Sequence, residues 1–373
     1  EKSYAAVEPG SVNANGNISI KALNDGEATA KLTEGLQVSI IGINPGNDIP
    51  TYAYYDTEIY IGGKLNASGK IDIYTCNLTT YVNGDSVGVL VSANVKKPSN
   101  YVNEMVRNTI DTSAEIVALG DISILTDADA VLSAIADADS GGLFSGGTLQ
   151  ARNTLIREVT IDILSGALIR STNGNISIIA DGGKSDNILT KTTGSSNGFV
   201  AAFDGMLAST EYDSHVTVNV NKGTSISADG GNVIINAYVS ANKIQNIMEI
   251  GGGGFAAIMD GDADYDWDAN AGHYLSAKVN VGTAGSGDNT YIYGNNVTIF
   301  AGIRNLNISN TSSVSVSGAG GNGKSYAYAR FYLEAQVNVS DAKIRGLDTV
   351  VIKSSGTPES SGKHINIYAY SSI

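Results

Sequence analysis

GNISI (residues 174–178) is the stretch that decides the fold, because close copies of it recur along the chain. Gly, Asn or Asp opens each copy, the second residue is polar, and the third and fifth are Ile or Val. Successive copies lie 51 to 64 residues apart, and such regular spacing indicates an internal repeat. The copies are GNISI (16–20), GKIDI (69–73), GDISI (120–124), GNISI (174–178), GNVII (231–235), NNVTI (295–299) and DTVVI (348–352).

A second phrase, such as VTIDI (159–163), precedes several copies of the first one. In both phrases Val or Ile alternates with Thr, Asn, Ser or Asp, and alternation with a period of two predicts a strand with one apolar face. Turn residues such as Gly and Asn lie between the phrases. The other copies are IYIGG (59–63), VTVNV (216–220), AKVNV (277–281) and AQVNV (335–339).

Short strands bounded by turn residues fit either a sandwich of hairpins or a parallel β-solenoid. The recurrence of equivalent phrases favours the solenoid, in which equivalent strands of successive coils stack. We therefore expect an all-β, elongated parallel β-solenoid, a right-handed β-helix with Gly/Asn-rich turns. It forms one domain over residues 1–373, built of degenerate repeats of about 50–64 residues. With coils of about 20 residues, each repeat would supply two or three coils, and the rod would be about 90 Å long.

Residues 98–140 depart from this pattern, because glycine is scarce until their end. They are predicted as an irregular or partly helical insertion. Residues 101–111 could form one or two helical turns or a strand, and the sequence leaves this open. "ADAVLSAIADA" (128–138) has a helix-favouring composition, but small residues also alternate in it. For residues 127–140 we favour a strand.

Composition excludes several classes of function. Charged residues make up 16% of the chain, there are 44 glycines, and the formal net charge is −14. Nucleic-acid binding needs clustered Lys and Arg, so a nucleic-acid partner is not expected. Cys76 is the only cysteine, so the chain can form no internal disulfide. No apolar run reaches about 18 residues, so no transmembrane span is expected, and the first residues do not have the pattern of a signal peptide.

Four stretches together resemble the repeats of filamentous-haemagglutinin-like adhesins and related leukotoxin-type exoproteins, which are two-partner-secreted proteins of Gram-negative bacteria. They are SGGLFSGG (140–147), VTIDI (159–163), GNISIIA (174–180) and NGFVAAFDG (197–205). The resemblance implies a β-helical stalk that an outer-membrane transporter exports and that is displayed outside the cell, at the bacterial surface. It carries over no catalytic residue, because the shared phrases contain none.

Five aspartates alternate along one segment, which places them on one face of a strand. One interpretation is a solvated acidic face. The other is a calcium site, because Ca²⁺ prefers oxygen ligands and like charges in a row repel. The EF-hand pattern fails here, since Trp267 replaces its glycine and His273 its glutamate. No other cofactor is expected. The candidate metal ligands are Asp260, Asp262, Asp264, Asp266 and Asp268.

Three functions remain. The first is a non-enzymatic adhesive stalk that contacts a host or bacterial surface receptor or a glycan. The second is a fibre or sheath subunit that self-associates end to end. The third and least expected is a polysaccharide-active β-helix enzyme, because basic residues are few and spread out and no motif links His215, His273 and His364. The tyrosines of residues 51–60, 325–333 and 367–370 could stabilise a strand face or bind sugar.

Overall fold

The computed structural model describes residues 2–33, 47–90, 94–265, 275–329, 332–356 and 365–372. Within these ranges the chain is all-β and contains no helix. The strands are β1 (Lys2–Val7), β2 (Ser11–Ala14), β3 (Ile18–Asn24), β4 (Glu27–Thr33), β5 (Asn47–Ile61), β6 (Lys64–Ala67), β7 (Ile71–Leu90), β8 (Asn94–Ile110), β9 (Glu115–Ala118), β10 (Ile122–Ile163), β11 (Leu168–Ser171), β12 (Ile176–Gly182), β13 (Asn187–Val220), β14 (Ser225–Ala228), β15 (Val233–Tyr265), β16 (Leu275–Val281), β17 (Thr290–Ala329), β18 (Leu333–Val339), β19 (Ala342–Ser355) and β20 (Ile365–Ser372).

Every described strand pairing is parallel, which confirms the predicted parallel all-β class. The recurring phrases lie directly opposite one another. Ile122 of β10 pairs with Ile71 of β7 on one side and with Ile176 of β12 on the other. The pairing step is therefore the full repeat of 51 to 64 residues. The expected step of about 20 residues, and the rod length derived from it, are wrong, because the strands between the phrases are long.

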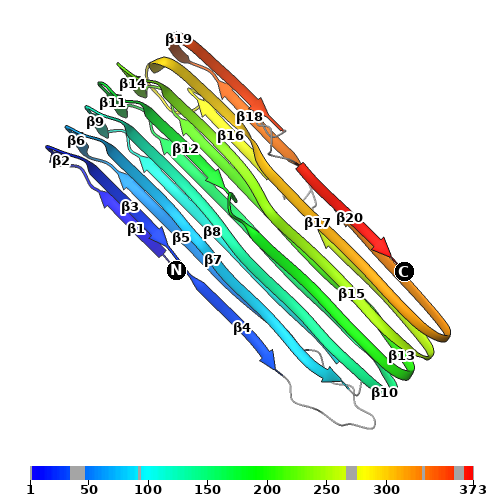
Figure 1. Ribbon diagram of the computed structural model, residues 1–373. Coiled ribbons are helices and arrows are strands. Elements are labelled where there is room, and N and C mark those ends of the chain that lie inside the picture. Colours follow the sequence, from blue (N-terminus) through cyan, green and yellow to red (C-terminus); the bar gives the residue numbers. More distant parts are fainter. Residues whose placement is uncertain are drawn as a thin grey trace.

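The strands lie side by side, with β1 to β4 along one edge and β18 to β20 along the opposite edge (Figure 1). They form two layers. One layer contains β3, β7, β12 and the first part of β10, and the other contains β1, β5, β8 and the last part of β10. The layers meet through side chains, as where the Asn108 amide on β8 donates a 2.8 Å hydrogen bond to the Thr126 hydroxyl on β10.

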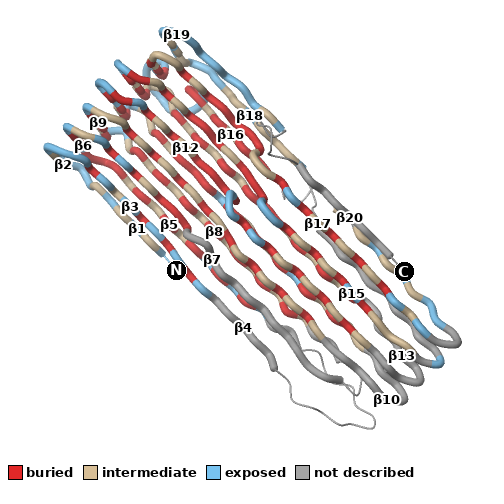
Figure 2. The backbone as a smooth tube through the Cα atoms, viewed as in Figure 1, coloured by how far each residue is buried: buried red, intermediate tan, exposed pale blue. Residues whose placement is uncertain are grey.

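The core lies between the layers and runs in columns of identical or similar side chains. One column contains Ile71, Ile122, Ile176, Val233 and Val297, each at most 1% exposed. Figure 2 shows the resulting alternation of buried and less buried positions along each strand. Burying such a side chain contributes about 1.5–3 kcal/mol relative to leaving it exposed. A second, smaller cluster is richer in Ala and Met: Ala134, Ala136, Leu149, Ala151, Met206, Ala208, Met248, Ile250 and Val314.

The polar second position of the recurring phrase has a definite role. Asn175 accepts a hydrogen bond on Oδ1 from the backbone N–H of Asn232 at 2.9 Å, and Asn232 accepts one from the N–H of Asn296 at 3.1 Å. Asp121 accepts in the same way from the N–H of Asn175 at 2.9 Å. Each of these side chains accepts a hydrogen bond from a backbone N–H of the following repeat. Without it, this N–H would have no partner in the pairing between strands. We call this row the phrase ladder.

Glycine occupies the turn that follows the second phrase in two successive repeats. Gly166 and Gly223 occupy equivalent positions there, with φ of 92° and 84°. Non-glycine residues rarely adopt this region. A Cβ on Gly166 would also lie 3.0 Å from the carbonyl oxygen of Thr112 in the preceding repeat. Close stacking therefore favours glycine at these two turns, whereas Ser113 occupies the equivalent position of the preceding repeat.

The structure of residues 98–140 differs from the irregular or partly helical insertion that the sequence predicts. No described residue of this stretch is helical, and it forms parts of β8 and β10 together with β9. Residues 101–110 alternate strictly between buried and half-buried positions, as do residues 122–137. The predicted irregular or partly helical insertion is thus wrong, and the strand favoured for 127–140 is correct. The helix-favouring composition does not produce a helix here, because Ala and Val side chains also fit the inward positions of a strand.

The described residues include no helix that could cross a membrane.

Candidate functional site

Three tyrosines on the outer faces of β5 and β8 form an exposed aromatic surface, which we call the tyrosine platform. Tyr52 and Tyr54 are two residues apart on β5 and so share one face, with 63% and 57% of their surface exposed. Tyr101 on β8 pairs in register with Tyr52. Its ring centroid lies 6.1 Å from that of Tyr52 and 6.0 Å from that of Tyr54. These are contact distances for aromatic rings, so the platform is a built surface.

Burial, and then the neighbouring Tyr54 and Glu211, raise the pKa of Tyr101 above the usual value for tyrosine. The Tyr101 hydroxyl therefore stays protonated at neutral pH and can donate a hydrogen bond.

A pocket adjoins the platform on either side. The first, of about 360 Å³, is the Tyr52 pocket, and it spans three adjacent strands: β5, β8 and β10. The second, of about 330 Å³, is the Tyr54 pocket. The Tyr52 pocket is lined by Pro50, Tyr52, Lys97, Pro98, Ser99, Gln150 and Arg152. The Tyr54 pocket is lined by Lys2, Tyr54, Tyr55, Asp56, Asn103 and Met105.

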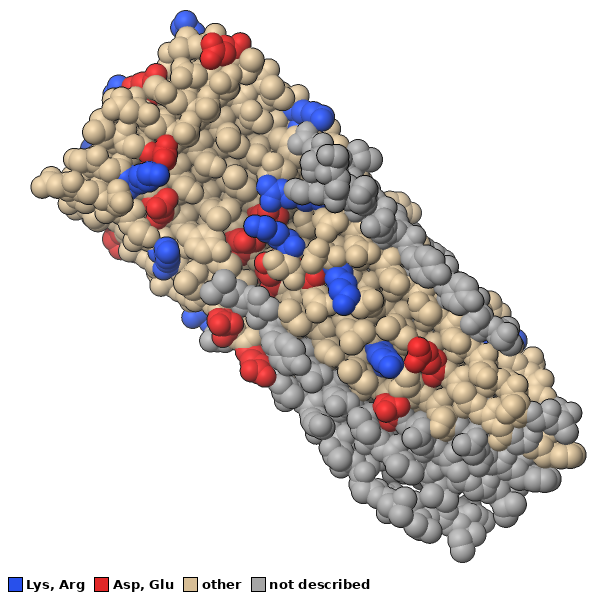
Figure 3. All heavy atoms as spheres, in the orientation of Figure 1, with Lys and Arg blue, Asp and Glu red and all other residues tan. Residues whose placement is uncertain are grey.

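The two pockets differ in charge. In the Tyr52 pocket, Lys97 and Arg152 form no ion pair with any described residue, and the described lining residues include no carboxylate. In the Tyr54 pocket, the Lys2 ammonium lies 3.2 Å from the Asp56 carboxylate. On the described part of the face shown in Figure 3, charged side chains are few and uncharged residues cover most of the surface. In a chain of net charge −14, the lining of the Tyr52 pocket thus carries two cations, Lys97 and Arg152.

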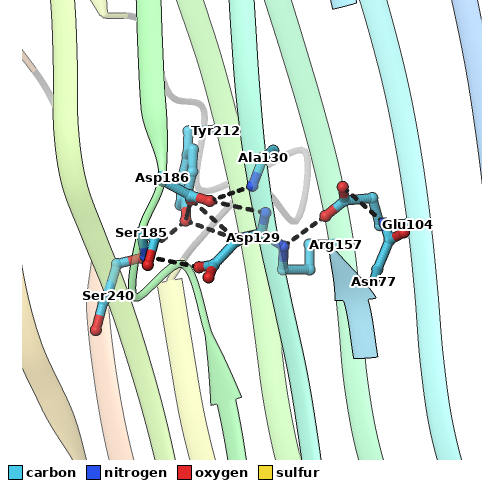
Figure 4. A network of polar contacts seen from close by, with 9 residues as sticks. All are labelled: Asn77, Glu104, Asp129, Ala130, Arg157, Ser185, Asp186, Tyr212 and Ser240. Atoms are coloured by element: carbon cyan, nitrogen blue, oxygen red, sulfur yellow. Dashed lines mark hydrogen bonds and ion pairs between the residues drawn. The ribbon is translucent and has the colours of Figure 1, made fainter. Parts of the chain in front are cut away.

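A second polar constellation lies inside the protein, around Arg157 of β10 (Figure 4). Its guanidinium donates to Glu104 Oε2 through Nε at 2.7 Å, and forms two hydrogen bonds to Asp186, of 2.8 and 3.0 Å. Arg157, Glu104 and Asp186 are all fully buried. Burial lowers the pKa of Arg157, but Asp186 and then Glu104 raise it by more, so the guanidinium stays charged. We call this set the buried ion network.

Further donors satisfy the two carboxylates. The Asn77 amide donates to Glu104 Oε1 at 3.0 Å, and the backbone N–H of Ala130 donates to Asp186 Oδ1 at 2.7 Å. Tyr212 donates to Asp186, and its hydroxyl also lies 2.8 Å from the carbonyl oxygen of Ser240. The network joins both layers, since Asn77 belongs to one and Glu104 to the other. The charged groups of the network have no solvent contact, and their hydrogen bonds link the two layers.

A row of titratable groups crosses the sheet beside this network. Cys76, Asp127, Asp181 and Tyr238 lie at equivalent positions of β7, β10, β12 and β15. Burial, followed by repulsion from Asp129 and Asp181, raises the pKa of Asp127 to about 7. Asp181 accepts a hydrogen bond from the guanidinium of Arg304. Burial also raises the pKa of the Cys76 thiol to about 12, which makes it unreactive.

The candidate calcium ligands are only partly described. Asp260, Asp262 and Asp264 lie in β15, opposite Lys324, Tyr326 and Tyr328 of β17. Asp266 and Asp268 lie outside the described residues. Among the described residues no group of three or more His, Cys, Asp or Glu side chains is arranged to hold a metal. The calcium site therefore stays a prediction.

The histidines do not form a site with one another within the described residues. His215 bonds locally, with Nδ1 2.9 Å from the Ser276 hydroxyl and Nε2 2.8 Å from an Asp213 carboxylate oxygen. His273 and His364 lie outside the described residues.

Sequence reasoning missed the buried ion network. A signal was present, because Glu104 and Arg157 stand at positions where the flanking alternation places Val102, Val106 and Val159 inward. A charge at an inward strand position indicates a buried partner. The tyrosines of residues 51–60 are evident in the sequence, but the cations Lys97 and Arg152 beside them come from other strands.

Comparisons with protein-family models, with curated proteins and with solved structures returned no significant match.

Proposed function

We propose that the chain is a rigid, non-enzymatic β-solenoid segment of a secreted bacterial surface protein, with an adhesive role. The observation that carries this proposal is the pairing step. Each repeat pairs in parallel with the next one, so that the phrase residues Ile71, Ile122 and Ile176 stand in one row. Continued along the chain, such pairing produces a column in which backbone hydrogen bonds run along the axis. That arrangement suits a stiff, extracellular stalk.

The tyrosine platform supplies a contact surface for adhesion. Single exposed aromatic side chains are common, but a contiguous group of exposed rings indicates a binding surface. Tyr52 and Tyr54 present their rings outward, while Ala53 between them faces the core. A stalk that carries such a surface can bind a receptor or glycan without any catalytic group.

An enzymatic function is less well supported. Glycoside hydrolysis uses a pair of carboxylates at a substrate groove. The described residues that line the Tyr52 pocket contain none, and Asp56 in the Tyr54 pocket pairs with Lys2. Glu104 and Asp186 are buried in the ion network, where no sugar can reach them.

Engineered disulfides test the proposed column. Asp162 pairs in register with Asn219, so cysteines at both positions would have Cα atoms within the range that a disulfide bridges. Asp162→Cys with Asn219→Cys, in a Cys76→Ser background, should oxidise readily. Asp162→Cys with Thr217→Cys is the matched control, because Thr217 is on the same face but two residues out of register. Equal oxidation of both pairs, or of neither, would contradict the proposed register.

End-to-end self-association is the second candidate, and one observation favours it. Val350 and Ile352 of β19 are 43% and 47% exposed, although they pair with Val297 and Ile299, which are fully buried. These side chains extend the core columns, so this edge could accept a further strand. Sedimentation velocity tests it: mass should increase with protein concentration, and Ile352→Lys should abolish the increase. A constant monomer mass would exclude this candidate.

A further inference from the structure

The Tyr52 pocket combines two kinds of recognition group within one shallow site. The Tyr52 ring and the Pro50 and Pro98 rings supply flat apolar surface, and Lys97, Ser99, Gln150 and Arg152 supply polar groups. Small-molecule sites commonly show this division, in which apolar surface supplies affinity and a few polar groups fix orientation.

The aromatic part fits a sugar ring. A pyranose has one face of C–H bonds, and this face packs against an aromatic ring, while hydroxyl groups around the rim seek hydrogen bonds. Tyr52 and Tyr54 are exposed and lie on one strand face, and Tyr101 supports both rings at about 6 Å. A platform of several rings, with a pocket at each end, suits a short chain of sugar units.

The two cations of the pocket, Lys97 and Arg152, indicate that the sugar carries a negative charge. Arg152 is exposed and Lys97 is half-buried, and neither forms an ion pair with a described residue. A guanidinium can bind a carboxylate through two parallel hydrogen bonds. Two acids lie near this face: Asp48 of β5 pairs in register with Lys97, and Glu211, one strand beyond Arg152, accepts a 3.4 Å hydrogen bond from Thr154. Anionic ligand groups are therefore favoured at the Arg152 side of the platform.

We infer that the Tyr52 pocket and the tyrosine platform bind an acidic saccharide. One sugar ring lies on Tyr52, and its carboxylate pairs with Arg152 and Lys97. This inference rests on the proposed adhesive function and names the ligand class of the same surface. A nucleic acid is disfavoured because two cations cannot offset the repulsion from a chain of net charge −14. An acidic peptide has the same charge, but peptides usually add to a sheet edge or fill a deep apolar groove.

The test uses the intact chain and three probes in isothermal titration calorimetry. The probes are tri-galacturonic acid, neutral galactotriose and triglutamate. Wild-type protein should bind tri-galacturonic acid at least about tenfold more tightly than galactotriose, since a charge-assisted pair supplies the difference. Arg152→Gln should remove that preference and leave galactotriose affinity within about twofold. Tyr52→Ala should weaken both sugars about tenfold.

Two matched variants control for general effects. Arg170→Gln removes an exposed arginine that pairs with Asp229, and Tyr326→Ala removes an exposed tyrosine of β17. Neither should change the affinity for any probe. Circular dichroism spectra of all variants should match the wild type, since every substituted side chain is on the surface.

The outcomes separate the two proposals. Equal binding of the two sugars would overturn the acidic class, and equal or tighter binding of triglutamate would overturn the saccharide class. If the disulfide test succeeds but no probe binds, the column remains supported and the saccharide site is wrong. If the disulfide register fails while Arg152-dependent binding of tri-galacturonic acid is seen, the site stands without the column.

Discussion

Arg157 and Glu104 lie directly opposite one another on β10 and β8, with both side chains fully buried and a 2.7 Å hydrogen bond between them. Arg157→Met leaves the buried carboxylates of Glu104 and Asp186 without a counter-ion, whereas Glu104→Gln leaves Arg157 paired with Asp186. We expect Arg157→Met to lower the free energy of unfolding by about 3–5 kcal/mol, and Glu104→Gln to lower it by less. Urea unfolding measures the change.

The control for this pair is Arg170→Gln, which breaks a largely exposed ion pair with Asp229. Exposed pairs contribute about 0–1 kcal/mol, so its unfolding midpoint should hardly move. Similar losses in the buried and exposed variants would show that the buried ion network does not stabilise the layers.

Asp127 makes stability depend on pH. Burial, Asp129 and Asp181 raise its pKa in the folded protein to about 7, whereas an unfolded chain has about 3.9. The folded state thus binds the proton more tightly, and its stabilising contribution is complete below about pH 4 and lost as pH rises towards 7. Asp127→Asn should be more stable than the wild type at pH 8, with the difference shrinking towards pH 4. Thermal unfolding across this range measures it.

Asp121→Asn is the matched control, because the shift there has the opposite sign. The backbone N–H of Asn175 and then Lys70 lower the pKa of Asp121, so its ionised form is favoured in the folded protein. Its stabilising contribution is present above the unfolded pKa and is lost on acidification. A gain at pH 8 in both variants would point to a general effect of charge removal.

The phrase ladder predicts a modest, local cost. Asn232→Ala removes the acceptor for the backbone N–H of Asn296. We expect a loss of about 1 kcal/mol in urea unfolding, as for a typical hydrogen bond. Asn242→Ala is the comparison, since Asn242 accepts only an exposed side-chain hydrogen bond from Asn305. Equal losses would mean that capping of the next repeat has no special value.

The reactivity of the Cys76 thiol measures how tightly the core is packed around it. The side chain is 3% exposed, and burial raises its thiol pKa to about 12. Because the thiolate is the reactive form, 5,5′-dithiobis-(2-nitrobenzoate) should not label the native protein within an hour at pH 8. Labelling should be complete within minutes in 6 M guanidinium chloride. Rapid labelling of the native chain would show that the layers open readily around β7.

The recurring phrases carried most of what the sequence could reveal about the fold. Ile18, Ile71 and Ile122 recur because each packs on the next, so their spacing equals the strand register. The size of the pairing step was harder to predict. Segments between the phrases, such as residues 236–276, have little in common with their counterparts, and nothing in them shows how many strands they form.

The candidate sites depend on contacts that cross the register. Arg157 and Asp186 meet only because the turn before β13 returns Asp186 to the core. The Tyr52 pocket likewise needs three strands, and the 100 residues that separate Tyr52 from Arg152 conceal it in the sequence. Alternation predicts which way a side chain points, but it does not predict which distant side chain it meets.

The pairing step, which is the number of residues between paired positions, also determines how long a column a chain of given length can build. Stacked strands are about 4.8 Å apart, so a repeat of 51 to 64 residues adds only that distance to a column built in this way. The same segment fully stretched would cover about 180 Å. A filament 1000 Å long would need about 200 repeats, or more than about 10,000 residues. Such a chain places most of its residues across the width of the column and few along its length. A column with a broad cross-section resists bending far better than a narrow one.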